Sequence, residues 1–129
     1  MRILGIDYGD KKIGLAFGET SARVAVPLDV IRNEGAVTIE ALIRRIQEED
    51  IDQVVVGVPL PQGNHSSVQL EKTRDFIAML AQIVSIPVVE EDESFTSVES
   101  VRLQQEFHAQ ADEDALAAML IVQSYIDQL

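Results

Sequence analysis

The chain has 129 residues, a length that suits one domain able to bury roughly two thirds of its unfolded surface. Hydrophobic residues make up 47% and charged residues 25%, which is ordinary for a globular protein in water. Cysteine is absent, so disulfide frameworks, thiolate zinc sites and a cysteine nucleophile are excluded. No signal-peptide pattern follows Met1 and no run approaches the ~18 apolar residues of a transmembrane helix. We therefore expect a cytoplasmic protein without membrane association.

The charge balance is strongly acidic. Twenty-two acidic residues against ten basic ones give a formal net charge of −12. Such a charge repels nucleic acid and anionic membranes over a Debye length of ~8 Å, whereas a typical non-specific DNA-binding protein is basic. An acidic chain can still act on nucleic acid if some carboxylates hold divalent cations and the basic side chains gather on one face. The alternative is a solvated acidic surface.

The first half of the chain predicts three strands followed by a helix. Apolar runs at 2–7 and 12–17 are joined by a polar turn, the pattern of a β-hairpin. A third strand is expected near Pro27–Arg32. Between residues 39 and 46, apolar residues recur at i, i+3, i+4 and i+7, which predicts an amphipathic helix that ends at 48–50.

The second half predicts two more strands, each preceded by a helix, and then helices alone. Residues 54–58 form a short β-branched run, typical of a strand buried on both faces. A helix from about Leu70 to Val84 leads to a strand at 86–89, which ends in the acidic run 90–93. We expect one further helix to end near Phe107 and a last one around residues 116–121.

The predicted order β-β-β-α-β-α-β-α-α defines an α/β fold. Strands separated by helices must be parallel and connect by right-handed crossovers, whereas the first three can form an antiparallel meander. We expect a five-stranded mixed sheet flanked by helices, within a single domain over residues 1–129.

Acidic residues stand at strand ends that would meet on one rim of this sheet. In open α/β sheets, ligands gather beyond the carboxyl ends of the strands, where the topology changes. Asp7 ends the first strand, and Asp92 and Glu93 end the last one. Asp114, in the first turn of the final helix, could close the group from one side.

Carboxylates in such a group suit Mg²⁺ or Mn²⁺ better than zinc. Two such ions ~3.5–4 Å apart clamp the attacking and leaving oxygens of an in-line phosphoryl displacement. They would also neutralise carboxylates that otherwise repel phosphate. Lys11, Lys12 and Arg23 would then position a nucleic-acid backbone without reading bases.

Each carboxylate also has a purely structural interpretation. Asp7 could be a hairpin turn residue, and Asp92 and Glu93 could belong to a solvated loop before the next helix. Asp114 is favoured near a helix N-terminus by the helix dipole alone. The residues taken singly leave both interpretations open.

Four motifs stand in order along the chain: Gly5-Ile6-Asp7-Tyr8-Gly9 with Lys12-Ile13-Gly14; Val55-Val56-Gly57-Val58-Pro59-Leu60; Asp92-Glu93 with Thr96; and Asp114 with Ala117-Ala118 and Gln123-Ser124-Tyr125. Together they resemble the YqgF/RuvX family, Holliday junction resolvase-like proteins assigned to maturation of the small-subunit ribosomal RNA precursor. The resemblance covers nearly the whole chain.

The resemblance implies an RNase H-like fold and a nuclease that depends on Mg²⁺ or Mn²⁺. Its implied substrates are the 5′ end of pre-16S ribosomal RNA, or branched or structured nucleic acid. The family's acidic positions fall on Asp7, Glu93 and Asp114, with Asp92 as a further candidate ligand. The same residues follow from the argument that acidic residues gather at one rim of the sheet.

Two departures from the family pattern bear on substrate binding. Ser94 stands where the family usually has arginine, and Asp10 where threonine is common. A lost cation and an added anion would weaken the attraction for phosphate. The net charge and the absent arginine favour an alternative: a non-catalytic interaction module of the ribosomal or transcription machinery. A third interpretation is an ATP-binding domain of the actin and sugar-kinase type, which shares the hairpin motif. Those proteins need two such domains, and 129 residues supply one.

Overall fold

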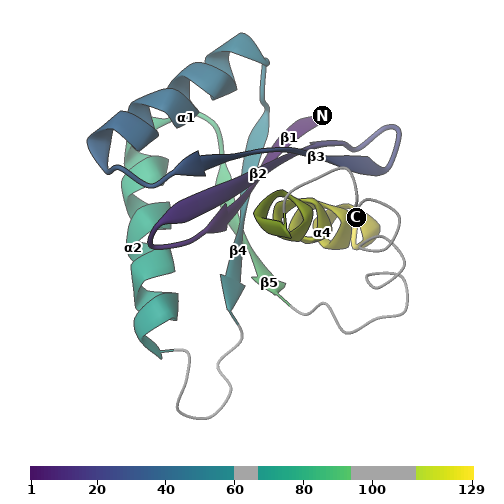
Figure 1. Ribbon diagram of the computed structural model, residues 1–129. Helices are drawn as coiled ribbons and strands as arrows, with labels where there is room; N and C mark the ends of the chain where they lie inside the picture. Colours follow the sequence, from purple (N-terminus) through teal and green to yellow (C-terminus); the bar gives the residue numbers. More distant parts are fainter. Residues whose placement is uncertain (60–66, 94–112) are drawn as a thin grey trace.

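The computed structural model describes residues 1–59, 67–93 and 113–129, although not the side chains of Ser67 and Glu93 (Figure 1). The elements in chain order are β1 (Arg2–Tyr8), β2 (Lys12–Glu19), β3 (Val24–Arg32), α1 (Ala36–Glu48), β4 (Gln53–Pro59), α2 (Ser67–Ile83), β5 (Val88–Glu93) and α4 (Glu113–Asp127). The expected helix ending near Phe107 lies outside the described residues. Within the described parts, no helix has the length and apolar character needed to cross a membrane.

The five strands form one mixed sheet in the order β3-β2-β1-β4-β5. Strands β1, β2 and β3 pair antiparallel as a meander, whereas β4 pairs parallel with both β1 and β5. This confirms the predicted five-stranded α/β sheet, in which three antiparallel strands precede the parallel crossovers.

Helices cover the two faces of the sheet unequally. Figure 1 shows α1 and α2 on one face and α4 on the other. Strand residues alternate between the two faces, as a period of two requires. In β1, Leu4 and Ile6 belong to the core with α1 and α2, whereas Ile3 belongs to the core with α4.

Two strand boundaries differ from the sequence-based expectation. Strand β3 begins at Val24, three residues before the expected start. The strand expected at 86–89 starts two residues later, because β5 begins at Val88. It contains the acidic run and pairs with β4 as far as Glu93, so Asp92 and Glu93 do end the last strand, and the alternative of a solvated loop is wrong for the residues up to Glu93. The acidic residues can lie in a strand because they have partners. Glu90 forms an ion pair with Arg74 of α2 at 3.4 Å, and buried Glu91 accepts hydrogen bonds from Ser124 of α4 and from Gln128 just after it.

Candidate functional site

Asp7 lies near the end of β1, on the face of the sheet that α4 covers. It is half-buried and pairs with Gly14 of β2 in the antiparallel register. Its face follows from the strand alternation: Ile3 packs in the α4 core, and a Cβ built on Gly5 would overlap the side chain of Val122. Asp7 follows Ile3 and Gly5 at the same spacing of two residues, so it lies on the side of the sheet that α4 covers.

Gly14 brings the first turn of α4 to Asp7. A Cβ built on Gly14 would overlap the main-chain carbonyl oxygen of Asp114, so the helix lies directly on the strand at this point. Any larger residue would push α4 away from the sheet. Because Gly14 is also the cross-strand partner of Asp7, the structure places Asp114 beside Asp7. Asp114 is half-buried in the first turn of α4, where the helix dipole stabilises its negative charge.

The end of β5 distinguishes Asp92 from Glu93. Val89 and Glu91 face α4, whereas Glu90 pairs with α2 on the opposite face. Asp92 alternates with Glu91 and is exposed, so it lies on the α2 side, away from Asp7. The backbone of Glu93 pairs with β4 at Pro59, and its side chain is outside the described part of the chain.

The described donors form an incomplete set of metal ligands. Among the side chains that the structure describes, no group of three or more His, Cys, Asp or Glu residues could hold a metal ion. Asp7 and Asp114 supply two carboxylates, which are the hard ligands that Mg²⁺ and Mn²⁺ prefer. These two residues fit such an ion in chemistry, because Mg²⁺ is commonly held by one or two carboxylates together with waters and substrate phosphates.

The loop between β1 and β2 is held from two sides. Asp10 forms an exposed ion pair with Lys72 of α2 at 3.3 Å. Asn33 donates from its main-chain N–H to the carbonyl oxygen of Lys11 and from its side-chain amide to that of Gly9, both at 2.9 Å. The loop is therefore fixed next to Asp7, and the anion of Asp10 has a cation beside it.

The structure separates the three predicted cations. Lys11 is exposed in the β1–β2 loop, and Lys12 is exposed at the start of β2. Both lie at the Asp7 end of the sheet. Arg23 lies in the β2–β3 turn, at the opposite end, where its guanidinium donates to the carbonyl oxygen of Ile126 at 3.2 Å. The fold does not bring Arg23 to the other two cations.

Three consecutive polar residues near the end of α4 each bond a different strand. The Oε1 atom of Gln123 accepts from a main-chain N–H of β3 at 3.2 Å. Ser124 donates to Glu91 of β5 at 2.8 Å, and the Tyr125 hydroxyl accepts from Gln53 of β4 at 2.9 Å. Sequence reasoning missed this arrangement, although three polar residues inside a mostly buried helix indicate that partners are needed.

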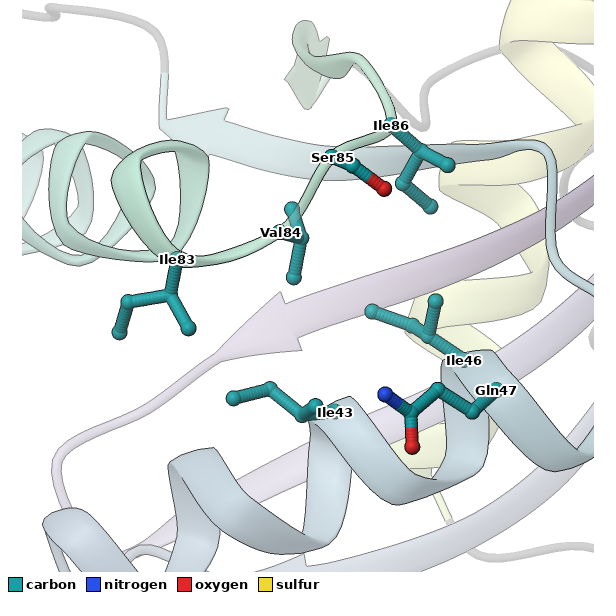
Figure 2. Close-up of a pocket in the computed structure, with 7 residues that line it drawn as sticks. All are labelled: Ile43, Ile46, Gln47, Ile83, Val84, Ser85 and Ile86. Carbon is teal, nitrogen blue, oxygen red and sulfur yellow. The ribbon is translucent and has the colours of Figure 1, made fainter.

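A hollow of about 160 Å³ lies at the end of the sheet opposite Asp7. Figure 2 shows apolar side chains from α1, from the end of α2 and from the connection between α2 and β5 around it, including Ile43, Ile46, Ile83 and Ile86. Its lining has no ionisable side chain, so it offers no acid–base or metal chemistry. The carboxylates at the other end are the stronger candidates for a site.

A family model described as "RuvX: Holliday junction resolvase" matches residues 1–128. Curated relatives carry the name "Putative pre-16S rRNA nuclease". The one from Thermoanaerobacter pseudethanolicus is 35% identical over 134 residues, covering 98% of this chain and 96% of that protein. The one from Koribacter versatilis is 34% identical over 133 residues, covering 98% of this chain and 87% of that protein.

Solved structures share the fold at low sequence identity. RuvC of T. thermophilus, in complex with a Holliday junction substrate, has a TM-score of 0.67 and 15% identity, covering 96% of this chain and 91% of that chain. The Fowlpox virus resolvase, in complex with substrate Holliday junction DNA, has a TM-score of 0.60 and 13% identity, covering 99% and 98%. These likenesses confirm the expected RNase H-like fold.

Proposed function

Since the chain belongs to the RuvX family of Holliday junction resolvase-like nucleases, we propose that it is a metal-dependent nuclease that processes the 5′ end of pre-16S ribosomal RNA. The observation that carries the proposal is the contact of α4 on Gly14, which sets Asp114 beside Asp7 at the end of β1. The name that the curated relatives share supports the RNA substrate, and the solved resolvase complexes support nucleic acid as the substrate class.

In this proposal Asp7, Asp114 and Glu93 hold Mg²⁺ or Mn²⁺. When bound, the ion supplies Lewis-acid chemistry that stabilises the charge developing on the phosphoryl oxygens. Asp7 lies on a strand, and Asp114 lies on a helix turn that contacts the neighbouring strand, so the main chain of both residues is fixed before an ion would bind. Because a strand alternates its faces, Asp92 lies on the face opposite Val89 and Glu91, and the proposal leaves it out of the set.

The proposal treats residues 1–129 as one nuclease domain that works in the cytoplasm, where ribosomal RNA precursor is made. Lys11 and Lys12 would position the sugar-phosphate backbone from the same end of the sheet as Asp7. Arg23 has no part in the proposed site, because it lies at the opposite end.

Cleavage of precursor RNA by an Asp7→Asn variant tests the proposal. The change keeps the size of the side chain and removes the charge that a cation needs. We expect the rate of cleavage with Mg²⁺ or Mn²⁺ to fall by about 100-fold or more, a typical cost of losing one transition-state contact, while the thermal midpoint stays nearly constant. Asp92→Asn is the matched control: the same substitution, on the other face of the sheet, should leave the rate close to that of the wild type.

Wild-type cleavage by Asp7→Asn would contradict the mechanism. The second candidate, a non-catalytic interaction module, has one structural observation in its favour: Asp10 places an anion in the loop next to Asp7. Calorimetric titration of the wild-type protein with Mn²⁺ separates the two. A heat of Mn²⁺ binding that the wild type shows and Asp7→Asn lacks supports the nuclease. No heat of Mn²⁺ binding in the wild type supports the interaction module.

A further inference from the structure

Two exposed cations lie side by side at the Asp7 end of the sheet. Lys12 opens β2, Arg32 closes β3, and the two are direct partners in the antiparallel register. Directly opposed residues have Cβ atoms about 4.5–5.5 Å apart, and like charges at such positions destabilise the sheet. Within the described residues, no ion pair involves either side chain. A chain with 22 acidic residues therefore keeps two adjacent cations without an acidic partner in this part of the structure.

This pair faces the same side of the sheet as the carboxylates. Lys12 precedes Gly14 by two residues, so both belong to the face on which α4 packs. Arg32 shares that face as the cross-strand partner of Lys12. Adjacent strands are about 4.8 Å apart, so β3 lies roughly 10 Å across the sheet from the strand of Asp7. The cations are near enough to contact the same nucleic-acid strand as the carboxylates, and, being donors only, they are suited to its phosphates and not to a metal ion.

Hydrogen bonds fix the main chain around the pair. The Thr38 hydroxyl, buried in α1, donates to the carbonyl oxygen of Arg32 at 2.7 Å. The next residue, Asn33, donates to the carbonyl oxygens of Lys11 and Gly9. The end of β3, the start of α1 and the β1–β2 loop are thus joined. Anchored backbones reduce the ordering cost of binding, because only the side-chain ends remain to be fixed.

We propose that Lys12 and Arg32 bind the phosphates of the nucleic-acid strand next to the cleaved bond, on the β3 side of the carboxylates. The inference rests on the proposed function, and it adds Arg32 to the residues that bind the nucleic-acid backbone. Arginine matches phosphate oxygens with two parallel N–H groups, and the anion relieves the repulsion between the two cations. Contacts of this type position a strand without selecting its sequence.

The salt dependence of binding tests the proposal. The probes are a single-stranded RNA with the precursor 5′ extension and a four-way DNA junction, with Ca²⁺ replacing Mg²⁺ so that binding is measured without turnover. A plot of log K against log salt has a negative slope. Each lost phosphate contact makes this slope shallower, by about 0.7 for single strands and about 0.9 for duplex. We expect this decrease from Arg32→Gln and from Lys12→Gln, and about twice the decrease from the double variant.

Arg44→Gln is the matched control. Arg44 is exposed on α1, on the opposite side of the sheet, and within the described residues it also has no ion pair. Its loss changes the net charge as much as the loss of Arg32 does, and the slope should stay that of the wild type. Arg32→Lys keeps the charge and should keep most of the slope. Thermal midpoints of all variants establish that each one is folded.

The outcomes separate this inference from the proposed function. Equal slopes for Arg32→Gln and Arg44→Gln overturn the Lys12–Arg32 contact, even if the wild type cleaves precursor RNA. A wild type that cleaves nothing, yet binds with a slope that Arg32→Gln lowers, keeps the contact and overturns the nuclease. Failure of the wild type to bind either probe overturns both.

Discussion

The two ends of α4 are held by different kinds of contact. Near its C-terminus, Gln123, Ser124 and Tyr125 each form a hydrogen bond to a different strand. At its first turn, the main chain of Asp114 rests on Gly14 with no side chain between them. One end is fixed by specific polar partners, and the other by the absence of a Cβ. A rise of 1.5 Å per residue separates the two ends by about 16 Å.

The acidic residues near the two ends of α4 also differ in how their carboxylates are used. Glu91, at the C-terminal end of α4, is buried and accepts hydrogen bonds from Ser124 at 2.8 Å and from Gln128 at 2.6 Å. Its lone pairs are used to hold β5 against α4. Asp7 and Asp114 are only half-buried and lie at the end of the sheet where β1 ends. Carboxylates that serve the fold and carboxylates suited to chemistry thus occupy opposite ends of one helix.

Gly14→Ala is expected to have the largest effect, because it adds the Cβ that the contact with α4 excludes. The overlap is with main-chain atoms of Asp114, so the helix turn must move. Overpacking of this kind costs about 1–3 kcal/mol of unfolding free energy. A displacement of about 1 Å at a catalytic group lowers rates by about 100-fold. Urea unfolding and RNA cleavage measure the two effects.

Gly35→Ala is the control for this comparison. Gly35 precedes α1 with φ +69°, and a Cβ there would meet nothing within 4 Å. The substitution should cost about 1 kcal/mol through backbone strain and leave cleavage unchanged. If Gly14→Ala cleaved as well as Gly35→Ala does, close packing of α4 on β2 would not be what positions Asp114.

The opposite end of α4 should affect stability without affecting chemistry. Ser124→Ala removes one of the two donors to buried Glu91, which we expect to lower the unfolding free energy by about 1–2 kcal/mol. Tyr125→Phe removes the acceptor of Gln53 and should cost about 1 kcal/mol. Both variants should keep kcat, measured at a temperature where they are fully folded. A tenfold loss of kcat in either would show that this end also controls the site.

The Asp10–Lys72 ion pair allows a smaller test at the site end. Asp10→Asn removes an anion from the loop beside Asp7 and releases Lys72, so nucleic acid should bind a few-fold more tightly at low salt. Lys72→Gln leaves the anion and should weaken binding by a similar factor. The pair is exposed, so either change should alter unfolding free energy by less than about 1 kcal/mol. Shifts of affinity in the same direction would contradict a charge effect.

Periodicity predicted most of the fold, because strands such as β1 and β4 bury apolar residues that the sequence displays directly. The strand-end position of Asp7 and the helix-start position of Asp114 follow from the same patterns. Their proximity does not, since it depends on Gly14 lying under α4, a contact between segments 100 residues apart.

The remaining errors have local causes. The apolar run 86–89 shows only the first part of β5, because Glu and Asp are poor strand formers and their partners, Arg74 and Ser124, lie on other elements. Arg23 follows Lys12 by only 11 residues, yet β2 carries the chain to the other end of the sheet. Arg32 has no sequence pattern of its own, and only the register with Lys12 reveals it.

Glu19 provides the smallest test, at the end of the sheet away from Asp7. Its carboxylate accepts hydrogen bonds from the Ser21 main-chain N–H at 3.1 Å and the Ser21 hydroxyl at 2.9 Å. The N-terminal ammonium lies 3.1 Å away. In this order, these contacts lower the pKa of Glu19 from 4.5 to about 2. All of them favour the ionised form.

A lowered pKa fixes the sign of the pH dependence. The folded protein binds the proton of Glu19 less readily than the unfolded chain does, so the stabilisation is complete above pH 4.5 and is lost as the pH falls toward 2. The stability difference between wild type and Glu19→Gln should therefore be constant near neutrality and shrink between those values, because other carboxylates titrate equally in both. Urea midpoints at a series of pH values measure it. A difference that persists at pH 2 would contradict the assignment, whereas a change in RNA cleavage near neutrality would mean that this end of the sheet also serves the site.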